Sequence, residues 1–254
     1  MTAPGARWTV SFDRVADRYD ASRGGHARAE MTVAAIAPWL TASSPVIEVG
    51  VGTGLIASKL AARGCSVVGF DVSLRMLERA QRRLGPRVAV GDAHRLPVRA
   101  ATADSVIFVH VLHLVADMPA TFAEAARVLR PGGRVVAICA PDDEPTDDAG
   151  RLLADLRRRL GRPPAAAPDR VADAAESAGL AVVHEEQLHH DMPMASADFG
   201  RSLQDRLWSW TWDVDNDTWA ALVAPIITEL RALPQADEPR NISHSRTLLV
   251  FAAR

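Results

Sequence analysis

Three glycines at alternate positions constrain this chain more than any other feature of its sequence. Gly50, Gly52 and Gly54 follow the short apolar run 46–49 and precede a helical pattern that begins at Leu55. Glycine reaches backbone conformations that other residues avoid, and its missing Cβ lets a ligand come close to the chain. A tight turn without a ligand would explain one such glycine. Three in this spacing after a strand predict a ligand-binding loop.

Strand and helix patterns alternate from residue 45 to residue 140. Apolar runs typical of buried strands cover 46–49, 66–70, 87–90, 105–109 and 134–140. Helical patterns cover 55–63, 74–84, 118–129, 149–160 and 169–178, and two further strands are expected at 181–186 and 247–252. Strands that are buried on both faces and joined by helices pair in parallel. We therefore predict a doubly wound α/β fold.

The ends of the chain complete this organisation. Residues 1–44 are expected to form a helical cap, with two helices around a turn at 23–25, and residues 45–140 the ligand-binding core. The long segment 189–245 is predicted to be a mostly helical insertion within one domain that spans 1–254. Its tryptophans are interpreted either as core anchors, favoured for at least two of them, or as the aromatic wall of a ligand pocket. They are Trp208, Trp210, Trp212 and Trp219.

Charge and cysteine content exclude several classes of protein. With 29 Lys and Arg against 31 Asp and Glu, no field of one sign is available to bind a nucleic acid. Cys65 and Cys139 are isolated in or beside apolar runs, which predicts buried, reduced thiols and no metal site. The longest apolar stretch, 106–115, is too short to span a bilayer, and the N-terminus lacks a signal pattern. The expectation is a soluble, cytoplasmic protein without nucleic-acid or membrane partners.

The spacing of the three glycines and the acidic residue beside them indicate which ligand the loop binds. A dinucleotide loop spaces its glycines as G-x-G-x-x-G to seat a pyrophosphate. Here the third glycine comes one residue early, and Glu48 lies at the end of the preceding strand. A carboxylate repels a pyrophosphate but attracts an ammonium or a sulfonium group. These features favour a cationic nucleoside that carries an amino acid over NAD.

Two further acids follow the next two strands. Asp71 is placed to accept the hydroxyls of a ribose, although it could also cap the next helix together with Ser73. Asp92, with the backbone of Ala93, could receive an exocyclic amine, although an aspartate that merely forms a turn is a nearly equal alternative. Because the carboxyl ends of parallel strands share one edge of a sheet, both acids and Glu48 are predicted to line one crevice.

This constellation resembles the class I S-adenosylmethionine-dependent methyltransferases, in particular the small-molecule group with a type 11 domain. The likeness rests on the glycine loop, Asp71, Asp92 and the stretches 12–20, 104–117 and 127–133. It implies a seven-stranded sheet whose last strand is antiparallel, and S-adenosyl-L-methionine as a cofactor that leaves as S-adenosyl-L-homocysteine. The cofactor set then adds Tyr19 and Arg23, which would close over the methionine end, and Val72, Ala93 and Val109.

The same resemblance implies methyl transfer to a small molecule by in-line displacement, with positioning of the reactants as the main source of rate. His110 and His113, after the fourth strand, are the candidate general bases, and could equally do no more than hydrogen-bond the backbone there. Two other functions stay open at this point: an NAD-dependent oxidoreductase and a non-catalytic binding protein with this fold. The sequence names neither the acceptor nor the oligomeric state.

Overall fold

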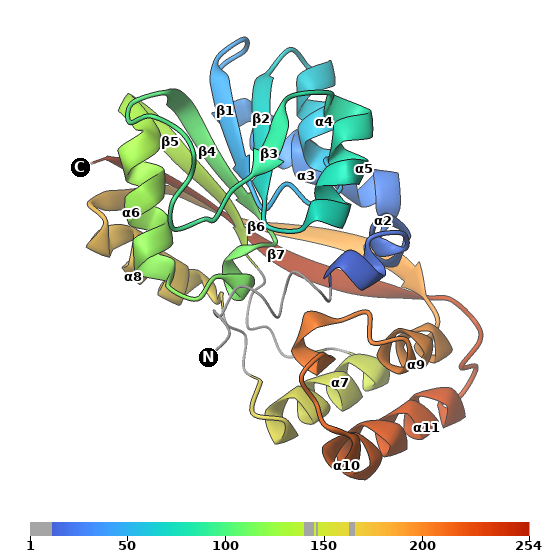
Figure 1. Ribbon diagram of the computed structural model, residues 1–254. Coiled ribbons are helices and arrows are strands. Elements are labelled where there is room, and N and C mark those ends of the chain that lie inside the picture. Colours follow the sequence, from blue (N-terminus) through green and yellow to red (C-terminus); the bar gives the residue numbers. More distant parts are fainter. Residues whose placement is uncertain (1–11, 140–144, 146, 163–165, 254) are drawn as a thin grey trace. The chain divides into compact units, whose positions relative to one another are not determined.

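A seven-stranded sheet organises the computed structural model, which describes residues 12–139, 145, 147–162 and 166–253 (Figure 1). The strands are β1 (Pro45–Val49), β2 (Ser66–Asp71), β3 (Val88–Val90), β4 (Ala103–Val109), β5 (Leu129–Cys139), β6 (Leu180–Met194) and β7 (Arg240–Ala253). Their order across the sheet is β3-β2-β1-β4-β5-β7-β6. Neighbours from β3 to β5 run parallel, whereas β7 is antiparallel to β5. The predicted doubly wound sheet with an antiparallel last strand is confirmed.

Helices cover both faces of this sheet (Figure 1). One layer is α3 (Gly25–Ile36), α4 (Leu55–Ala62) and α5 (Leu74–Leu84), and the other is α6 (Met118–Val128) and α8 (Pro168–Ser177). Each layer has its own buried apolar cluster: Val33, Leu60 and Leu77 belong to the first, and Phe122 and Val171 to the second. Burial on both faces explains why the central strands are apolar throughout.

The N-terminal segment is helical, as predicted. Residues 12–15 and α2 (Tyr19–Ser22) are helical, a turn at 23–24 follows, and α3 then leads through a short 3-10 turn (Ala37–Trp39) to β1. Residues 1–11 of the predicted cap lie outside the described residues.

Three strands extend more than two residues beyond their predicted bounds. β5 begins at Leu129, because its pairing with β4 starts early and then shifts register before the expected start at Arg134. The predicted turn at 131–133 therefore loops out of the ladder inside this strand. β6 and β7 also run well beyond the predicted 181–186 and 247–252, since pairing in the sheet adds residues that a short apolar pattern does not reveal.

The chain divides into two compact units. Unit 1 comprises Met1–Pro141, Ala166–Leu188 and Arg246–Arg254, and unit 2 comprises Asp142–Ala165 and His189–Ser245. The helices of unit 2 are α7 (Asp148–Arg159), α9 (Ser196–Gln204), α10 (Asn216–Thr218), a π-helical turn (Trp219–Val223) and α11 (Ala224–Ala232). The helical character predicted for the insertion is confirmed, and α7 belongs to the same unit. That the whole chain acts as one methyltransferase domain stays a prediction.

The tryptophans of unit 2 take part in its own packing. Trp208 stacks on Trp210 with ring centroids 5.5 Å apart, and the guanidinium of Arg206 lies 3.9 Å from the centroid of Trp219. The indole N–H of Trp212 donates to the carbonyl oxygen of Arg206 at 2.8 Å. These contacts support the interpretation as packing anchors, because each ring satisfies its apolar face or polar edge within the unit.

Candidate cofactor site

The glycine loop after β1 contains one glycine that faces open space. Gly50, Gly52 and Gly54 all have left-handed φ angles, of 71°, 54° and 73°. A Cβ at Gly50 would lie 2.4 Å from the side chain of Val111, and one at Gly54 would lie 2.9 Å from the backbone of Ala80. At Gly52 the nearest atom among the described residues, apart from the adjoining ones, is the carbonyl oxygen of Gly50, 4.0 Å away. Gly50 and Gly54 therefore permit close packing within the protein. Gly52 instead leaves an open space beside the backbone, called here the cradle, that a side chain would fill.

Asp71 lies beside this cradle at the end of β2. Its Oδ2 accepts a hydrogen bond from the backbone N–H of Gly52 at 2.8 Å, and its Oδ1 accepts one from the N–H of Ser73 at 2.9 Å. Burial raises the pKa of Asp71, while the backbone donors oppose that shift. The backbone N–H of Val72 is a third donor, and an ionised carboxylate has about four acceptor positions, so capacity remains for a further hydroxyl donor. Asp71 thus takes part both in the loop and in the turn before α5.

The leader before α3 is tied to the same loop. Thr53 donates its hydroxyl to Asp20 Oδ1 at 2.6 Å, and Arg83 donates to Asp20 Oδ2 at 2.7 Å. These two hydrogen bonds to Asp20 hold α2 against the glycine loop. Next to Asp20 in the chain, the ring of Tyr19 has the guanidinium of Arg23 5.6 Å from its centroid. Sequence reasoning missed Asp20 and Thr53, although both lie within stretches that carried the resemblance.

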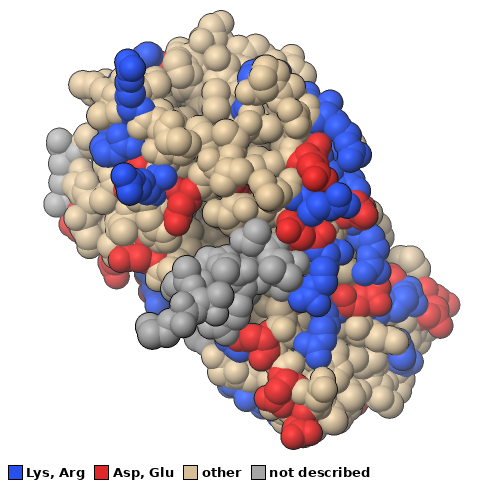
Figure 2. Space-filling model, viewed as in Figure 1, with Lys and Arg blue, Asp and Glu red and all other residues tan. Residues whose placement is uncertain are grey.

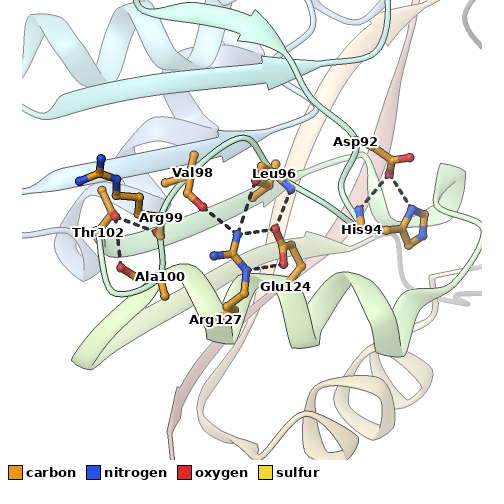
Figure 3. Close-up of polar contacts among 9 residues, drawn as sticks. All are labelled: Asp92, His94, Leu96, Val98, Arg99, Ala100, Thr102, Glu124 and Arg127. Atoms are coloured by element: carbon orange, nitrogen blue, oxygen red, sulfur yellow. Dashed lines mark hydrogen bonds and ion pairs between the residues drawn. The ribbon is translucent and has the colours of Figure 1, made fainter.

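Asp92 follows β3 and forms the turn that the sequence left as an alternative (Figure 3). Its Oδ1 accepts hydrogen bonds from the backbone N–H of His94 at 2.9 Å and from the imidazole Nδ1 at 2.6 Å. Partial burial would raise the pKa of Asp92, but these bonds lower it overall. The side chain is 64% exposed, so its carboxylate is also accessible to a ligand. Turn formation and ligand binding are compatible here.

An ion pair on α6 anchors the loop that carries Asp92 (Figure 3). Glu124 Oε1 accepts from the backbone N–H of Leu96 at 2.6 Å and from Arg127 at 2.7 Å, and Arg127 also donates to the carbonyl oxygen of Val98 at 2.8 Å. Arg127 opens the stretch 127–133 that supported the resemblance. In the structure it anchors the loop through Val98 and Glu124.

Apolar surface remains exposed between the two acids. Val72 directly follows Asp71 and is 40% exposed, and Val90, which pairs with Asp71 across the sheet, is 55% exposed. Exposed apolar residues rimmed by acceptors are typical of a ligand site. The open backbone at Gly52, the spare acceptor capacity of Asp71 and this apolar edge together fit a nucleoside. Ala93 and Val109, also predicted here, are half-buried.

Glu48 is buried within β1, with 2% of its surface exposed. It accepts a hydrogen bond from the backbone N–H of Ala57, in the first turn of α4, where the preceding Gly54 has no side chain to cap the helix. Its Oε2 has no hydrogen-bond partner among the described residues. Burial, with repulsion from Asp71, raises the pKa of Glu48 to about 8. Glu48 therefore supports the loop and, in the absence of a cationic ligand, retains a proton near neutral pH.

This raised pKa predicts a pH-dependent stability. The folded state keeps the Glu48 proton up to about pH 8, whereas the unfolded chain loses it near the ordinary value of 4.5. The unfolding free energy of the wild type should therefore fall, relative to that of Glu48→Gln, by about 2–4 kcal/mol between pH 5 and pH 8. Urea denaturation of both proteins across this range measures the difference. The exposed Glu78→Gln variant is the control, and a difference that stays constant with pH contradicts the assignment.

The two candidate bases have different surroundings. His110 follows β4 with a left-handed φ of 55°, and Arg28 Nη2 donates to its Nε2 at 2.6 Å. Burial and the charge of Arg28 hold the pKa of His110 well below its usual range. A guanidinium has no acceptor, so Nε2 accepts and the ring is neutral with its proton on Nδ1. His113 lies exposed in a 3-10 turn (Leu112–Leu114). Sequence reasoning missed Arg28, because no local pattern links it to β4.

The described part of the chain bears on metal and membrane binding. No three His, Cys, Asp or Glu side chains within it come together as a metal site. No helix in the described ranges combines the length and apolar character needed to cross a membrane. Cys65 and Cys139 are buried, as predicted, and neither is part of a disulfide within the described residues. On the face that Figure 2 shows, Lys and Arg atoms lie among Asp and Glu atoms.

Comparisons with known proteins agree with this geometry. A family profile described as a methyltransferase domain matches residues 47–137. The chain is 34% identical over 178 residues to the demethylmenaquinone methyltransferase of Mycobacterium sp. (strain JLS), an alignment that covers 65% of this chain and 75% of that protein. It is 32% identical over 131 residues to the biotin biosynthesis bifunctional protein BioHC of Cellvibrio japonicus (strain Ueda107), covering 50% of this chain and 26% of that protein.

A solved structure has the same fold. The phosphoethanolamine N-methyltransferase 2 of Haemonchus contortus, in complex with phosphomonomethylethanolamine and S-adenosylhomocysteine, superimposes with a TM-score of 0.62 at 17% identity. The superposition covers 100% of this chain and 60% of that one.

Proposed function

Because the chain belongs to the class I S-adenosylmethionine-dependent methyltransferases, we propose that it transfers a methyl group to a small molecule bound at the carboxyl edge of its sheet. It is an enzyme, and S-adenosyl-L-methionine is its cofactor. The observation that carries the proposal is the open backbone at Gly52, held 2.8 Å from the Asp71 carboxylate.

Each residue of the site has a proposed role. Asp71 accepts the ribose hydroxyls, Val72 packs on the adenine, and Asp92 with the backbone of Ala93 receives the exocyclic amine. Tyr19, which α2 holds near the loop, closes the methionine end together with Arg23. The roles match the chemistry of these groups: two acceptors, an apolar surface and an aromatic ring next to a cation.

The protein contributes mainly alignment. The bound cofactor supplies an activated methyl group on a positively charged sulfur, which leaves as a neutral thioether. Holding the reactants in line can contribute about 7–11 kcal/mol to lowering the barrier. His110 is neutral and its Nε2 already accepts a hydrogen bond from Arg28, so we assign it to the binding of the methyl acceptor through Arg28. The exposed His113 stays the candidate base for an acceptor that must lose a proton.

The relatives do not agree on an acceptor, since their names point to different reactions. The acceptor of this chain is therefore proposed only as a small molecule, not a nucleic acid. We also keep the proposal that the insertion 189–245 helps to select it. Protection of these residues from hydrogen–deuterium exchange, on addition of an acceptor that supports turnover, would test that role.

Calorimetry and a transfer assay test the proposed function. The folded protein should bind S-adenosylmethionine and S-adenosylhomocysteine with saturation and should not bind NAD. With a methyl-labelled donor, label should then pass to at least one member of a panel of small acids, amines and phenols.

Two results would replace the proposal with its alternatives. Binding of NAD without binding of S-adenosylhomocysteine would favour an oxidoreductase. Cofactor binding without transfer to any tested acceptor would favour a binding protein with this fold.

A further inference from the structure

A group of basic side chains gathers beyond the end of β4 in unit 1. Its members, called here the cationic cluster, are Arg23, Arg28, His110 and Arg246. They come from three separate parts of the chain: the turn after α2 with the following α3, the end of β4, and β7. All four are at least partly buried. Basic residues that leave water together need a reason, because burial of like charges is unfavourable.

Arg28 is the best-defined member. Its Nη2 donates to His110 Nε2 at 2.6 Å, and its Nη1 donates to the backbone carbonyl oxygen of Arg23 at 3.1 Å. Neither partner carries a negative charge. Among the described residues no carboxylate forms an ion pair with Arg28.

The electrostatics of Arg28 agree with this geometry. Burial, and repulsion from Arg246 and Arg23, lower the pKa of Arg28 to about 9. Burial and repulsion from Arg23 also lower the pKa of Arg246. Arginine otherwise keeps its charge in proteins, so the shift reflects first the burial of Arg28 and then the positive charges of Arg246 and Arg23 near it. An anion seated among these groups would relieve the repulsion.

The cluster lies apart from the acids of the nucleoside site. His110 directly follows β4, and Arg246 lies beside the end of β5, because the residue after it pairs with Cys139. Asp71 ends β2 and Asp92 follows β3 instead, and β1 separates the two groups in the sheet order. The methyl donor, S-adenosyl-L-methionine, also carries two positive groups, a sulfonium and an ammonium, and only one negative group, a carboxylate. In the proposed site its single carboxylate, at the methionine end, is left to Arg23, so Arg28 and Arg246 remain for an anion of the methyl acceptor.

We propose that the cationic cluster binds an oxyanion, a carboxylate or a phosphate, on the methyl acceptor. The inference rests on the proposed function and adds the charge of its substrate. Arg28 and Arg246 supply the hydrogen-bond donors, and neutral His110 holds the Arg28 guanidinium in place. Guanidinium groups suit this task, because their planar donor pairs match the oxygens of carboxylates and phosphates.

Calorimetry on the protein saturated with S-adenosylhomocysteine tests the proposal, since the cofactor then fills its own site. Succinate and inorganic phosphate are the probes, and succinamide is the uncharged control. At least one of the two anions should bind with saturation, and succinamide should not. Arg28→Met should weaken that binding at least about tenfold. The matched control is Arg130→Met, because Arg130 is exposed and pairs with Asp104 at the start of β4, at the opposite edge of the sheet.

Three measurements distinguish a cluster that binds the methyl acceptor from one that binds the cofactor. They are the affinity of Arg28→Met for S-adenosylhomocysteine, its melting temperature, and anion binding by the saturated wild type. Arg28→Met should keep S-adenosylhomocysteine affinity within about twofold and a melting temperature equal to or above that of the wild type, because it removes a buried cation. If it instead weakens S-adenosylhomocysteine about tenfold, and the saturated wild type binds no anion, the cluster belongs to the cofactor and the inference is overturned. Failure of the wild type to bind either cofactor form would overturn the proposed function itself, whereas absence of anion binding alone overturns only this inference.

Discussion

Gly52→Ala is expected to weaken S-adenosylhomocysteine binding at least about tenfold, or about 1.4 kcal/mol, in a protein that still folds. The added methyl group would fill the one open cradle of the glycine loop, where, apart from the adjoining residues, no atom of the described part of the chain lies closer than 4.0 Å. Alanine at the left-handed φ of 54° also strains the loop by about 1 kcal/mol, and this strain lowers stability without by itself explaining lost affinity. Calorimetry measures the affinity, and urea denaturation the stability.

Gly64→Ala is the matched control for this prediction. Gly64 follows α4 with a left-handed φ of 89°, and a Cβ there would meet no atom of the described residues beyond its chain neighbours within 4 Å. Both variants should lose similar stability, because both place alanine in the same backbone region. Only Gly52→Ala should lose affinity. Equal affinity in the two variants would show that the cradle does not hold the cofactor.

Asp71→Ala should weaken S-adenosylmethionine binding by about 1–3 kcal/mol, because the ribose hydroxyls would lose their acceptor inside a partly buried site. The substitution also leaves the N–H groups of Gly52 and Ser73 without their present acceptors. Some of the loss will therefore arise from a less ordered loop. Binding titrations give the total effect, and thermal denaturation gives the part that concerns folding.

Ser73→Ala separates the two roles of Asp71. Ser73 accepts a hydrogen bond from the N–H of Met76 and so caps α5, and its loss should cost about 1 kcal/mol of stability. It offers no acceptor to the ribose in the proposed arrangement, so affinity should stay within about twofold of the wild type. If Ser73→Ala and Asp71→Ala weaken binding equally, Asp71 acts only through the turn.

Local patterns were sufficient for most of the fold. The apolar run before Gly50 became β1, and the helix after it begins at Leu55 as predicted. Ser73 caps α5 as its position indicated. These elements could be read from the sequence because each depends on neighbours within a few residues: alternation, helical spacing, caps and glycine. The extra length of β6 and β7 could not, since it depends on pairing with distant strands.

The candidate site likewise contains features that the sequence predicts and contacts that only the folded chain creates. The order of strands and the acids at their ends were enough to predict that Asp71 lies near the glycine loop, because parallel strands bring their carboxyl ends to one edge. The 2.6 Å contact between Arg28 and His110 was not predictable, since 82 residues separate the two in the chain. The same is true of the contact between Asp20 and Thr53.

The amino-acid sequence by itself determined the parallel core, the glycine loop and the acids at the ends of the first three strands. The tertiary structure alone decided protonation and charge: Glu48 is buried beside Asp71 with a raised pKa, and His110 is kept neutral by burial and by Arg28. The physical reason is that a side chain's pKa depends on its desolvation and on charges within a few ångströms. Folding sets both, whereas the order of residues along the chain sets neither.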